Sequence, residues 1–397
     1  MGDKCNLIVY IDRMKVITQT KDLKEFCDSL IKSPFITVDT EFIRETTYWP
    51  LLCLIQVASP EEAAMIDPLA EGIDLSPFFE ILQNPDIVKV MHGCRQDIEI
   101  FYNLGHFIPT PLFDTQIAAM ACGFGDAVGY ETLIAKTVGA KIDKGSRFTD
   151  WARRPLSKAQ LEYALADVTH LRDAYQFLCQ QIEEKGRAAW VEEEMLSLHD
   201  VHNYDMPPEL AYQRLKMQDR RPNVVGVLIT VAAWREEQAR ERNIPRGRVI
   251  KDDAIREIAV QGPKNISELS RLRSIPKGFE NSRYAESLLS AIQRGLNLPK
   301  NELPVLAKPI VNRQGIGPLV ELLKVLLKQR CDSCDVAPKL IANVADLERI
   351  ASDQDPDVQA LKGWRYEVFG KYAMDLKAGK LALACEDDQV ILVKRNG

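Results

Sequence analysis

The chain has 397 residues, of which 46% are hydrophobic and 27% charged, and its formal net charge at pH 7 is −6. These values are typical of a soluble globular protein, and the length suggests two to four domains. No run approaches the ~18 apolar residues of a membrane-spanning helix. The N-terminus has no signal-peptide features, so we expect a cytoplasmic protein without a membrane partner.

The first half of the sequence alternates between strand-like and helix-like segments. Strands are predicted at 6–11, 35–42, 51–59, 63–68 and 87–93. Helices are predicted at 20–33, with Thr20 as its N-cap, and at 94–105, closed by Gly105, and the chain is mostly helical from there to about residue 200. Strands joined by short turns, together with strands flanked by helices, predict a mixed α/β sheet.

The second half has few strand signals. A linker at 206–208 leads to helical patterns that continue to about residue 297, and a proline-bearing linker at 296–309 precedes another helical set at 315–385. We therefore expect three domains, at 1–205, 207–297 and 315–385, of which the last two are small helical bundles.

Charge is distributed unevenly among these domains. Residues 207–297 contain 17 basic and 11 acidic side chains, a net charge of +6, so the rest of the chain carries −12. A basic module attached to an acidic one is typical of a protein that binds nucleic acid.

Two carboxylates occupy the predicted strand at 35–42. Asp39 and Glu41 are spaced i, i+2 and share a face of the strand, whereas Thr40 points to the opposite face. Close like charges raise the pKa values of both groups unless a cation intervenes, and oxygen ligands suit Mg²⁺ or Mn²⁺. Two such ions would need about four carboxylates.

Two further carboxylates are candidates for this site. Asp97 lies in the first turn of the helix that follows the 87–93 strand, although stabilisation of the helix dipole would also explain it. Tyr163 and Asp167 are spaced i, i+4 and project from one face of a helix, where a solvated carboxylate and a packed tyrosine are the alternative.

Together these motifs resemble those of the DEDD exonuclease superfamily. The tyrosine at position 163, four residues before Asp167, matches the tyrosine branch of that superfamily. The segments "VDTEF", "LCLIQVAS", "VMHGCRQDIEIF" and "DWARRPLSKAQLEYALADV" are similar to those of the ribonuclease D family over roughly residues 5–205. Residues 207–297 resemble the HRDC domain, the helical domain that this family shares with RecQ-type helicases, and 315–385 resemble a divergent second copy.

The resemblance implies a fold and a reaction. The fold would be a ribonuclease H-like exonuclease domain with a mixed sheet, followed by two helical bundles. Two divalent metal ions would be bound by Asp39, Glu41, Asp97 and Asp167, and Tyr163 would orient the attacking water. The substrates would be RNA 3′ ends, those of precursor tRNA and other small structured RNAs, trimmed to nucleoside 5′-monophosphates by a monomer. A DNA exonuclease and a nucleic-acid-binding scaffold with an inactive nuclease fold are the alternatives.

Other polar residues lie outside the set of candidate metal ligands. We interpret Asp114 as a helix N-cap and His92 as a structural histidine. Trp151, Arg153 and Arg154 would either contact RNA or pack within the domain. A cluster of arginines around one helix end in the first bundle is interpreted as a phosphate-binding surface: Arg235, Arg240, Arg242, Arg246 and Arg248.

Overall fold

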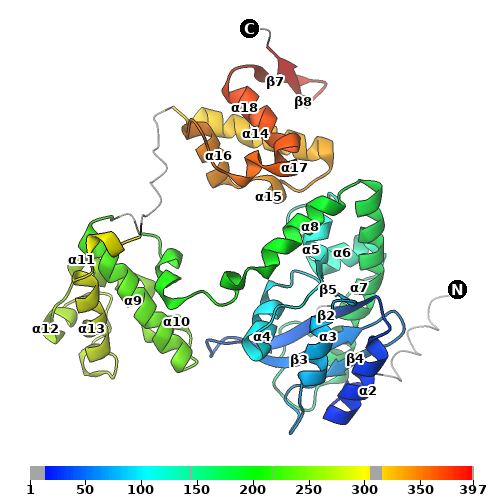
Figure 1. The fold of residues 1–397 in the computed structure, drawn as a ribbon, viewed down its shortest axis with the longest axis horizontal. Helices are drawn as coiled ribbons and strands as arrows, with labels where there is room; N and C mark the ends of the chain where they lie inside the picture. The colour runs from blue at the N-terminus through cyan, green and yellow to red at the C-terminus, as the bar shows by residue number, and fades with distance from the viewer. Residues whose placement is uncertain (1–13, 144, 218, 305–314, 396–397) are drawn as a thin grey trace.

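The structure, a computed structural model, describes residues 14–143, 145–217, 219–304 and 315–395. From residue 14 to about residue 205, the described part of the chain forms a six-stranded mixed sheet covered by helices (Figure 1). The strand order is β1-β4-β3-β2-β5-β6, with bounds Val16–Ile17 (β1), Phe35–Ile43 (β2), Leu51–Ala58 (β3), Ala63–Ile66 (β4), Val88–Met91 (β5) and Leu112–Asp114 (β6). The predicted mixed sheet is confirmed, while the strand predicted at 6–11 lies outside the described residues.

Strand β2 lies inside the sheet and is paired on both sides. It runs antiparallel to β3, with Asp39 opposite Gln56, and parallel to β5. Ile36 and Val38 are fully buried, and the register shifts between Glu41 and Phe42. Both carboxylates are held on a rigid backbone, because β3 pairs with β2 at Asp39 and Glu41 and β5 pairs with the residues just before them, Phe35 to Thr37.

The helices of this region largely follow the predicted pattern, with two differences at their ends. Helix α2 begins at Thr20, but Gln19 is its N-cap, and the Thr20 hydroxyl instead accepts a hydrogen bond from the Asp74 amide at 2.9 Å. Helix α4 includes Gly105, and the left-handed residue that closes it is His106, with φ of 57°. A side chain at Gly105 would collide with the Phe107 ring, which explains the glycine.

Helix α7 is the longest helix of the N-terminal region and begins with a capping box formed by Ser157 and Gln160. Its buried residues, among them Ala164, Val168 and Leu171, pack on the sheet. The helices of the region are α2 (Thr20–Leu30), α3 (Ser76–Gln83), α4 (Arg95–Gly105), α5 (Thr115–Ala121), α6 (Tyr130–Thr137), α7 (Lys158–Glu184) and α8 (Ala188–Leu196).

The first helical bundle follows a 3₁₀ segment at Pro208–Arg214. Its two longest helices approach closely, because a Cβ atom at Gly226 would lie 2.3 Å from the carbonyl oxygen of Gly295. The core between them is aliphatic, with Val227, Val231 and Leu288 buried. The helices are α9 (Pro222–Glu241), α10 (Arg246–Val249), α11 (Asp252–Gln261), α12 (Ile266–Leu269) and α13 (Ala285–Leu296).

The second bundle contains helices and also a β-hairpin, which the sequence did not predict. Strands β7 (Leu381–Glu386) and β8 (Gln389–Lys394) are antiparallel, and both turn residues, Asp387 and Asp388, have positive φ. Such a turn normally carries glycine, so an Asp-Asp pair is a weak hairpin signal. The helices are α14 (Gly317–Cys334), α15 (Pro338–Ile341), α16 (Val344–Ser352), α17 (Gly363–Arg365), a π-helical turn at Tyr366–Gly370 and α18 (Lys371–Lys377).

This second bundle packs directly on α5 to α8 and shares one hydrophobic core with them. The Trp190 and Trp364 rings stack with centroids 4.2 Å apart. Arg187, which is almost fully buried, donates hydrogen bonds to carbonyl oxygens of both parts, including that of Asp335 at 2.6 Å. Among the described residues, no helix has the length and apolar character needed to cross a membrane.

Candidate active site

The structure brings together three of the four predicted metal-binding carboxylates. Asp39 and Glu41 on β2 meet Asp167 on α7, and one oxygen from each lies within 4.8 Å of the other two. Helix α7 is fixed against β2 at this point because the Thr37 hydroxyl donates to the Val168 carbonyl at 2.8 Å. Thr37 lies two residues before Asp39, and Val168 directly follows Asp167, so this hydrogen bond helps to set the spacing of the group.

Asp97, the fourth predicted ligand, falls outside this group of three but faces it. It is buried in the first turn of α4, and the Thr40 hydroxyl donates a hydrogen bond to its carboxylate. Its negative charge raises the pKa values of both Asp39 and Glu41. Thr40 therefore links the strand that carries two of the acids to the helix that carries Asp97.

Burial and mutual repulsion make these carboxylates hard to ionise. Burial, reinforced by the charges of Asp167 and Asp97, raises the pKa of Glu41 to about 9. Burial also raises the pKa values of Asp97 and Asp167 to about 7, although hydrogen bonds from Thr40 and Tyr163 respectively oppose the shift. The pKa of Asp39 lies well above its ordinary range for the same reasons. A bound cation would remove the repulsion and favour the ionised forms.

Tyr163 lines the same cavity as Asp39 and Asp167. Its hydroxyl donates a hydrogen bond to Asp167, and its ring packs against buried Trp151 with centroids 6.2 Å apart. Burial followed by the charge of Asp167 raises the pKa of Tyr163, so the phenol stays protonated. The cavity measures about 380 Å³ and is lined by Asp39, His92, Gly93, Gln116, Gly129, Tyr130, Glu131, Thr132, Ile142, Arg147, Tyr163, Asp167 and Leu171.

Arg147 and Tyr130 are two of the lining residues that were not predicted from the sequence. The charge of Arg147 lowers the pKa values of Glu41 and Asp167. The Tyr130 hydroxyl donates to the Ala166 carbonyl at 2.9 Å, next to Asp167. Arg147 could have been considered because it is a basic residue in the polar segment before α7. The prediction instead selected Arg153 and Arg154, which lie nearer to that helix.

The donor set fits a hard divalent cation. All the candidate ligands are carboxylate oxygens, which suit Mg²⁺ or Mn²⁺, and the three that lie together come from rigid elements. The predicted divalent-metal requirement is therefore supported by the chemistry of the site.

Comparisons with known proteins agree with this geometry. Residues 14–183 match a 3′-5′ exonuclease family, and residues 226–292 match the HRDC domain. Ribonuclease D of Nitrobacter hamburgensis is 51% identical over 96% of this chain and 100% of that protein. Ribonuclease D of Bartonella henselae is 46% identical over 97% of this chain and 95% of that protein.

This chain belongs to the ribonuclease D family.

The structure agrees with that assignment. The solved structure of Escherichia coli RNase D, an exoribonuclease involved in structured RNA processing, matches 92% of this chain and 99% of its own, with a TM-score of 0.80 and 28% identity. As a ribonuclease D family member, the chain is a 3′-5′ exoribonuclease. The predicted enzyme class and the resemblance are thereby confirmed.

Asp114 and His92, near the carboxylate cavity, both have structural partners. Asp114 is the N-cap of α5, as predicted, and it also accepts hydrogen bonds from the Gly93 and Cys94 amides. His92 contacts the Thr115 hydroxyl at 2.9 Å and the Val128 carbonyl at 3.1 Å, and burial lowers its pKa. Both residues hold the loops around the cavity together.

In the segment at residues 150–156, before α7, some side chains are packed and others are exposed. Trp151 is buried, and the Arg154 guanidinium donates to both carboxylate oxygens of Asp67 at 2.6 Å. These contacts favour the packing interpretation for both residues. Arg153 is exposed and remains available for RNA.

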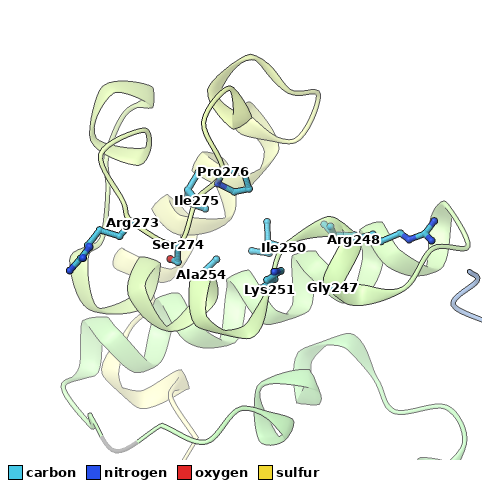
Figure 2. A pocket seen from close by; sticks show the side chains of 10 residues that line it. Gly247, Arg248, Ile250, Lys251, Ala254, Arg273, Ser274, Ile275 and Pro276 are labelled. Atoms are coloured by element: carbon cyan, nitrogen blue, oxygen red, sulfur yellow. The ribbon is translucent and has the colours of Figure 1, made fainter. Parts of the chain in front are cut away.

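The first helical bundle has a basic hollow of about 240 Å³. Figure 2 shows Arg248 and Arg273 at its opposite ends, with Lys251 and the apolar side chains of Ile250 and Ile275 between them. Cations on both sides of an apolar floor suit a nucleic-acid strand, whose phosphates and bases need those two kinds of surface.

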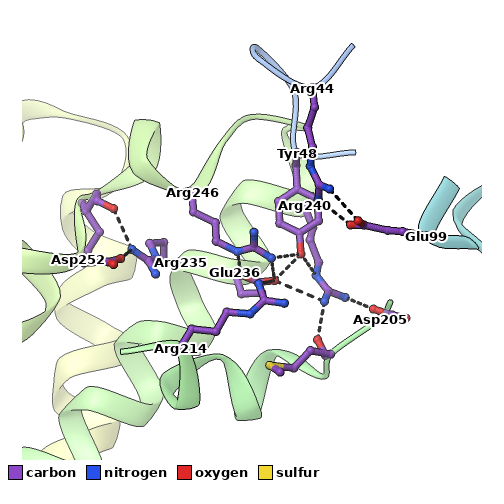
Figure 3. A network of polar contacts seen from close by, with 12 residues as sticks. Arg44, Tyr48, Glu99, Asp205, Arg214, Arg235, Glu236, Arg240, Arg246 and Asp252 are labelled. Carbon is purple, nitrogen blue, oxygen red and sulfur yellow. Dashed lines mark hydrogen bonds and ion pairs between the residues drawn. The ribbon is translucent and has the colours of Figure 1, made fainter. Parts of the chain in front are cut away.

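The predicted arginine surface on this bundle is wrong for three of its five members. Arg235 is 4% exposed and pairs with Asp252 at 2.6 Å. Arg240 pairs with Asp205 at 2.7 Å, and Arg246 donates to Glu236 at 2.6 Å. Figure 3 shows Arg240 and Arg246 converging on Tyr48 and Glu236 in one network, whereas Arg235 pairs separately with Asp252. Arg242 lies over the Tyr284 ring, and Arg248, at the hollow, is the member best placed for phosphate.

This network fastens the bundle to the catalytic region of the ribonuclease D fold. Tyr48, in the turn between β2 and β3, donates its hydroxyl hydrogen to Glu236 on α9 and accepts hydrogen bonds from Arg240 and Arg246. Burial alone would raise the pKa of Glu236, but hydrogen bonds from Arg246 and Tyr48 outweigh it and lower the pKa to about 2. The buried Glu236 carboxylate is thus kept ionised by its hydrogen bonds with Arg246 and Tyr48.

Replacing Glu236 should weaken this junction. Because Glu236→Gln leaves Arg246 and Tyr48 with a neutral partner, we expect the free energy of unfolding to fall by about 3 kcal/mol, measured by urea denaturation. The lowered pKa means that this stabilisation is present above pH ~4.5 and is lost as pH falls towards 2. Glu237→Gln, at an exposed neighbour, is the control. Equal loss in both variants would contradict the proposed role of the network.

The raised pKa values in the carboxylate group predict a second pH dependence. In metal-free protein the folded state binds more protons than the unfolded state between pH ~4 and 9, so the free energy of unfolding should fall as pH rises through that range. Added Mg²⁺ competes with those protons, so the increase in Tm that it causes should grow with pH. Calorimetry with and without EDTA measures both, and an increase in Tm that does not change with pH would refute the coupling.

Proposed function

We propose that RNA 3′ ends are hydrolysed at the carboxylate group, where Asp39, Glu41, Asp97 and Asp167 bind two Mg²⁺ or Mn²⁺ ions. The supporting observation is that oxygens of Asp39, Glu41 and Asp167 lie within 4.8 Å of one another, and that Asp39 and Asp167 line the cavity that also holds Tyr163. Bound there, the two ions would supply an activated water and stabilisation of the departing 3′ oxygen.

The protein side chains would orient the reactants. Tyr163 keeps its proton because its pKa is raised, and it projects from α7 one turn before Asp167. From that position the phenol would hydrogen-bond to the attacking water and align it with the terminal phosphodiester. Attack at that phosphorus, with departure of the 3′ oxygen of the preceding nucleotide, releases a nucleoside 5′-monophosphate.

We further propose that the substrates are precursor tRNAs and other small structured RNAs, and that the chain acts as a monomer. The involvement of Escherichia coli RNase D in structured RNA processing supports this class of substrate. The basic hollow of the first bundle would bind the body of the RNA while its 3′ tail reaches the carboxylates. The domains at 1–205, 207–297 and 315–385 would then divide into a catalytic domain and two supporting bundles.

Variants of α7 should separate metal binding from water orientation. Asp167→Asn removes a ligand charge, so we expect both Mn²⁺ binding and exonuclease turnover to fall by orders of magnitude. Tyr163→Phe keeps the carboxylates, so Mn²⁺ binding should persist while turnover falls at least a hundredfold. Calorimetric titration of Mn²⁺ and release of labelled mononucleotide are the two measurements. Glu183→Gln, exposed on the same helix, should change neither. Turnover of Tyr163→Phe at the level of Glu183→Gln would remove Tyr163 from the mechanism.

Substrate choice can be tested with matched oligonucleotides. A precursor tRNA with a short 3′ extension, an RNA strand and the corresponding DNA strand should be degraded in that order of kcat/KM, and EDTA should stop all three reactions. Faster degradation of DNA would favour the alternative of a DNA exonuclease. Equal rates on the precursor and the plain RNA strand would remove the proposed role of the first bundle in binding structured RNA.

A further inference from the structure

A short turn between α6 and α7 runs along the edge of the carboxylate cavity. Thr149 donates its hydroxyl hydrogen to the Ser146 carbonyl at 2.8 Å and accepts a hydrogen bond from Gln160 at 3.1 Å. Gln160 belongs to the capping box of α7, and Trp151 anchors the end of the turn in the core. The turn is therefore fixed to the helix that carries Tyr163 and Asp167.

The two residues at the tip of this turn are exposed in spite of that anchoring. Phe148 is 91% exposed, compared with 65% for Leu196, the next most exposed large hydrophobic side chain among the described residues. The Arg147 guanidinium lies over the Phe148 ring, 5.2 Å from its centroid. A fully solvated phenylalanine loses the free energy that burial would provide, so a ligand that covers the ring would recover it.

Arg147 connects this exposed ring to the reaction site. It lines the same cavity as Asp39, Tyr163 and Asp167, and its charge acts on Glu41 and Asp167. A cation beside an exposed aromatic ring matches the two surfaces of a single-stranded nucleic acid, a phosphate and the face of a base. RNA 3′ ends are the substrate of this enzyme, so the ligand chemistry and the location agree.

We propose that Arg147 and Phe148 bind the 3′-terminal segment of the RNA: Phe148 stacks on a base next to the cavity, and Arg147 contacts the adjacent phosphate. This inference rests on the proposed location of hydrolysis at the carboxylate group. Stacking tolerates any base, so the pair would hold the strand in register without selecting sequence. Each nucleotide removed would then require the strand to advance by one base over Phe148.

The binding test uses the full chain with Asp167→Asn, which keeps the RNA intact, and single-stranded RNAs that carry 2-aminopurine at one of the last four positions. We expect 2-aminopurine fluorescence to be quenched at the position that stacks on Phe148. Adding Phe148→Ala should remove that quenching and weaken binding about tenfold, and Phe148→Trp should restore both. Arg147→Ala should weaken binding and reduce the salt dependence by about one phosphate contact. Leu196→Ala is the control for loss of an exposed apolar side chain.

Kinetics in the otherwise unmodified enzyme provide an independent readout. Phe148→Ala should raise KM for single-stranded RNA about tenfold while kcat changes less than about twofold. If Phe148→Ala matches Leu196→Ala in quenching, affinity and KM, the inference is overturned. The exposed Phe148 ring would then be available to contact a protein partner instead of RNA. That outcome differs from failure of the proposed function, in which Asp167→Asn itself would still cleave RNA.

Discussion

Repulsion among buried carboxylates is the constraint on which the rest of the catalytic region depends. Asp39 and Glu41 are two residues apart on strand β2, and Asp167 and Asp97 bring two more acids towards them. A rigid backbone keeps the acids from moving apart, so their repulsion contributes to the raised pKa values of Asp39 and Glu41. The internal position of β2 and the hydrogen bond from Thr37 to the Val168 carbonyl supply that rigidity.

The same constraint explains the polar contacts around the group. Thr40 donates to Asp97, Tyr163 donates to Asp167, and Arg147 opposes the negative charge from the cavity side. These contacts do not offset the effects of burial and mutual repulsion, because the pKa values of all four acids remain raised. The group therefore keeps its affinity for a divalent cation, and the surrounding residues fix where that cation would lie.

The sequence predicted best those features that depend on local spacing. The i, i+2 pair at Asp39 and Glu41, the i, i+4 pair at Tyr163 and Asp167, and the N-cap at Asp114 all depend on regular backbone geometry, and the structure places them accordingly. Prediction was poorer where partners are distant in the chain. The hydrogen bonds that join Arg240 and Arg246 to Tyr48, almost 200 residues away, could not be read from sequence spacing. Arg147 lies at the cavity because of the conformation of the turn between α6 and α7, which spacing in the sequence does not predict.

The hydrophobic core that α5 to α8 share with the second bundle has a consequence for how the protein is divided. Residues such as Leu178 and Leu326 belong to one cluster although they come from opposite halves of the chain. Cutting the chain before α14 would uncover apolar surface on the nuclease itself, so the catalytic region does not end where its sequence motifs end. The hydrophobic core extends beyond the exonuclease family match at residues 14–183, and a minimal nuclease would have to retain the last helices or replace the surface that they cover.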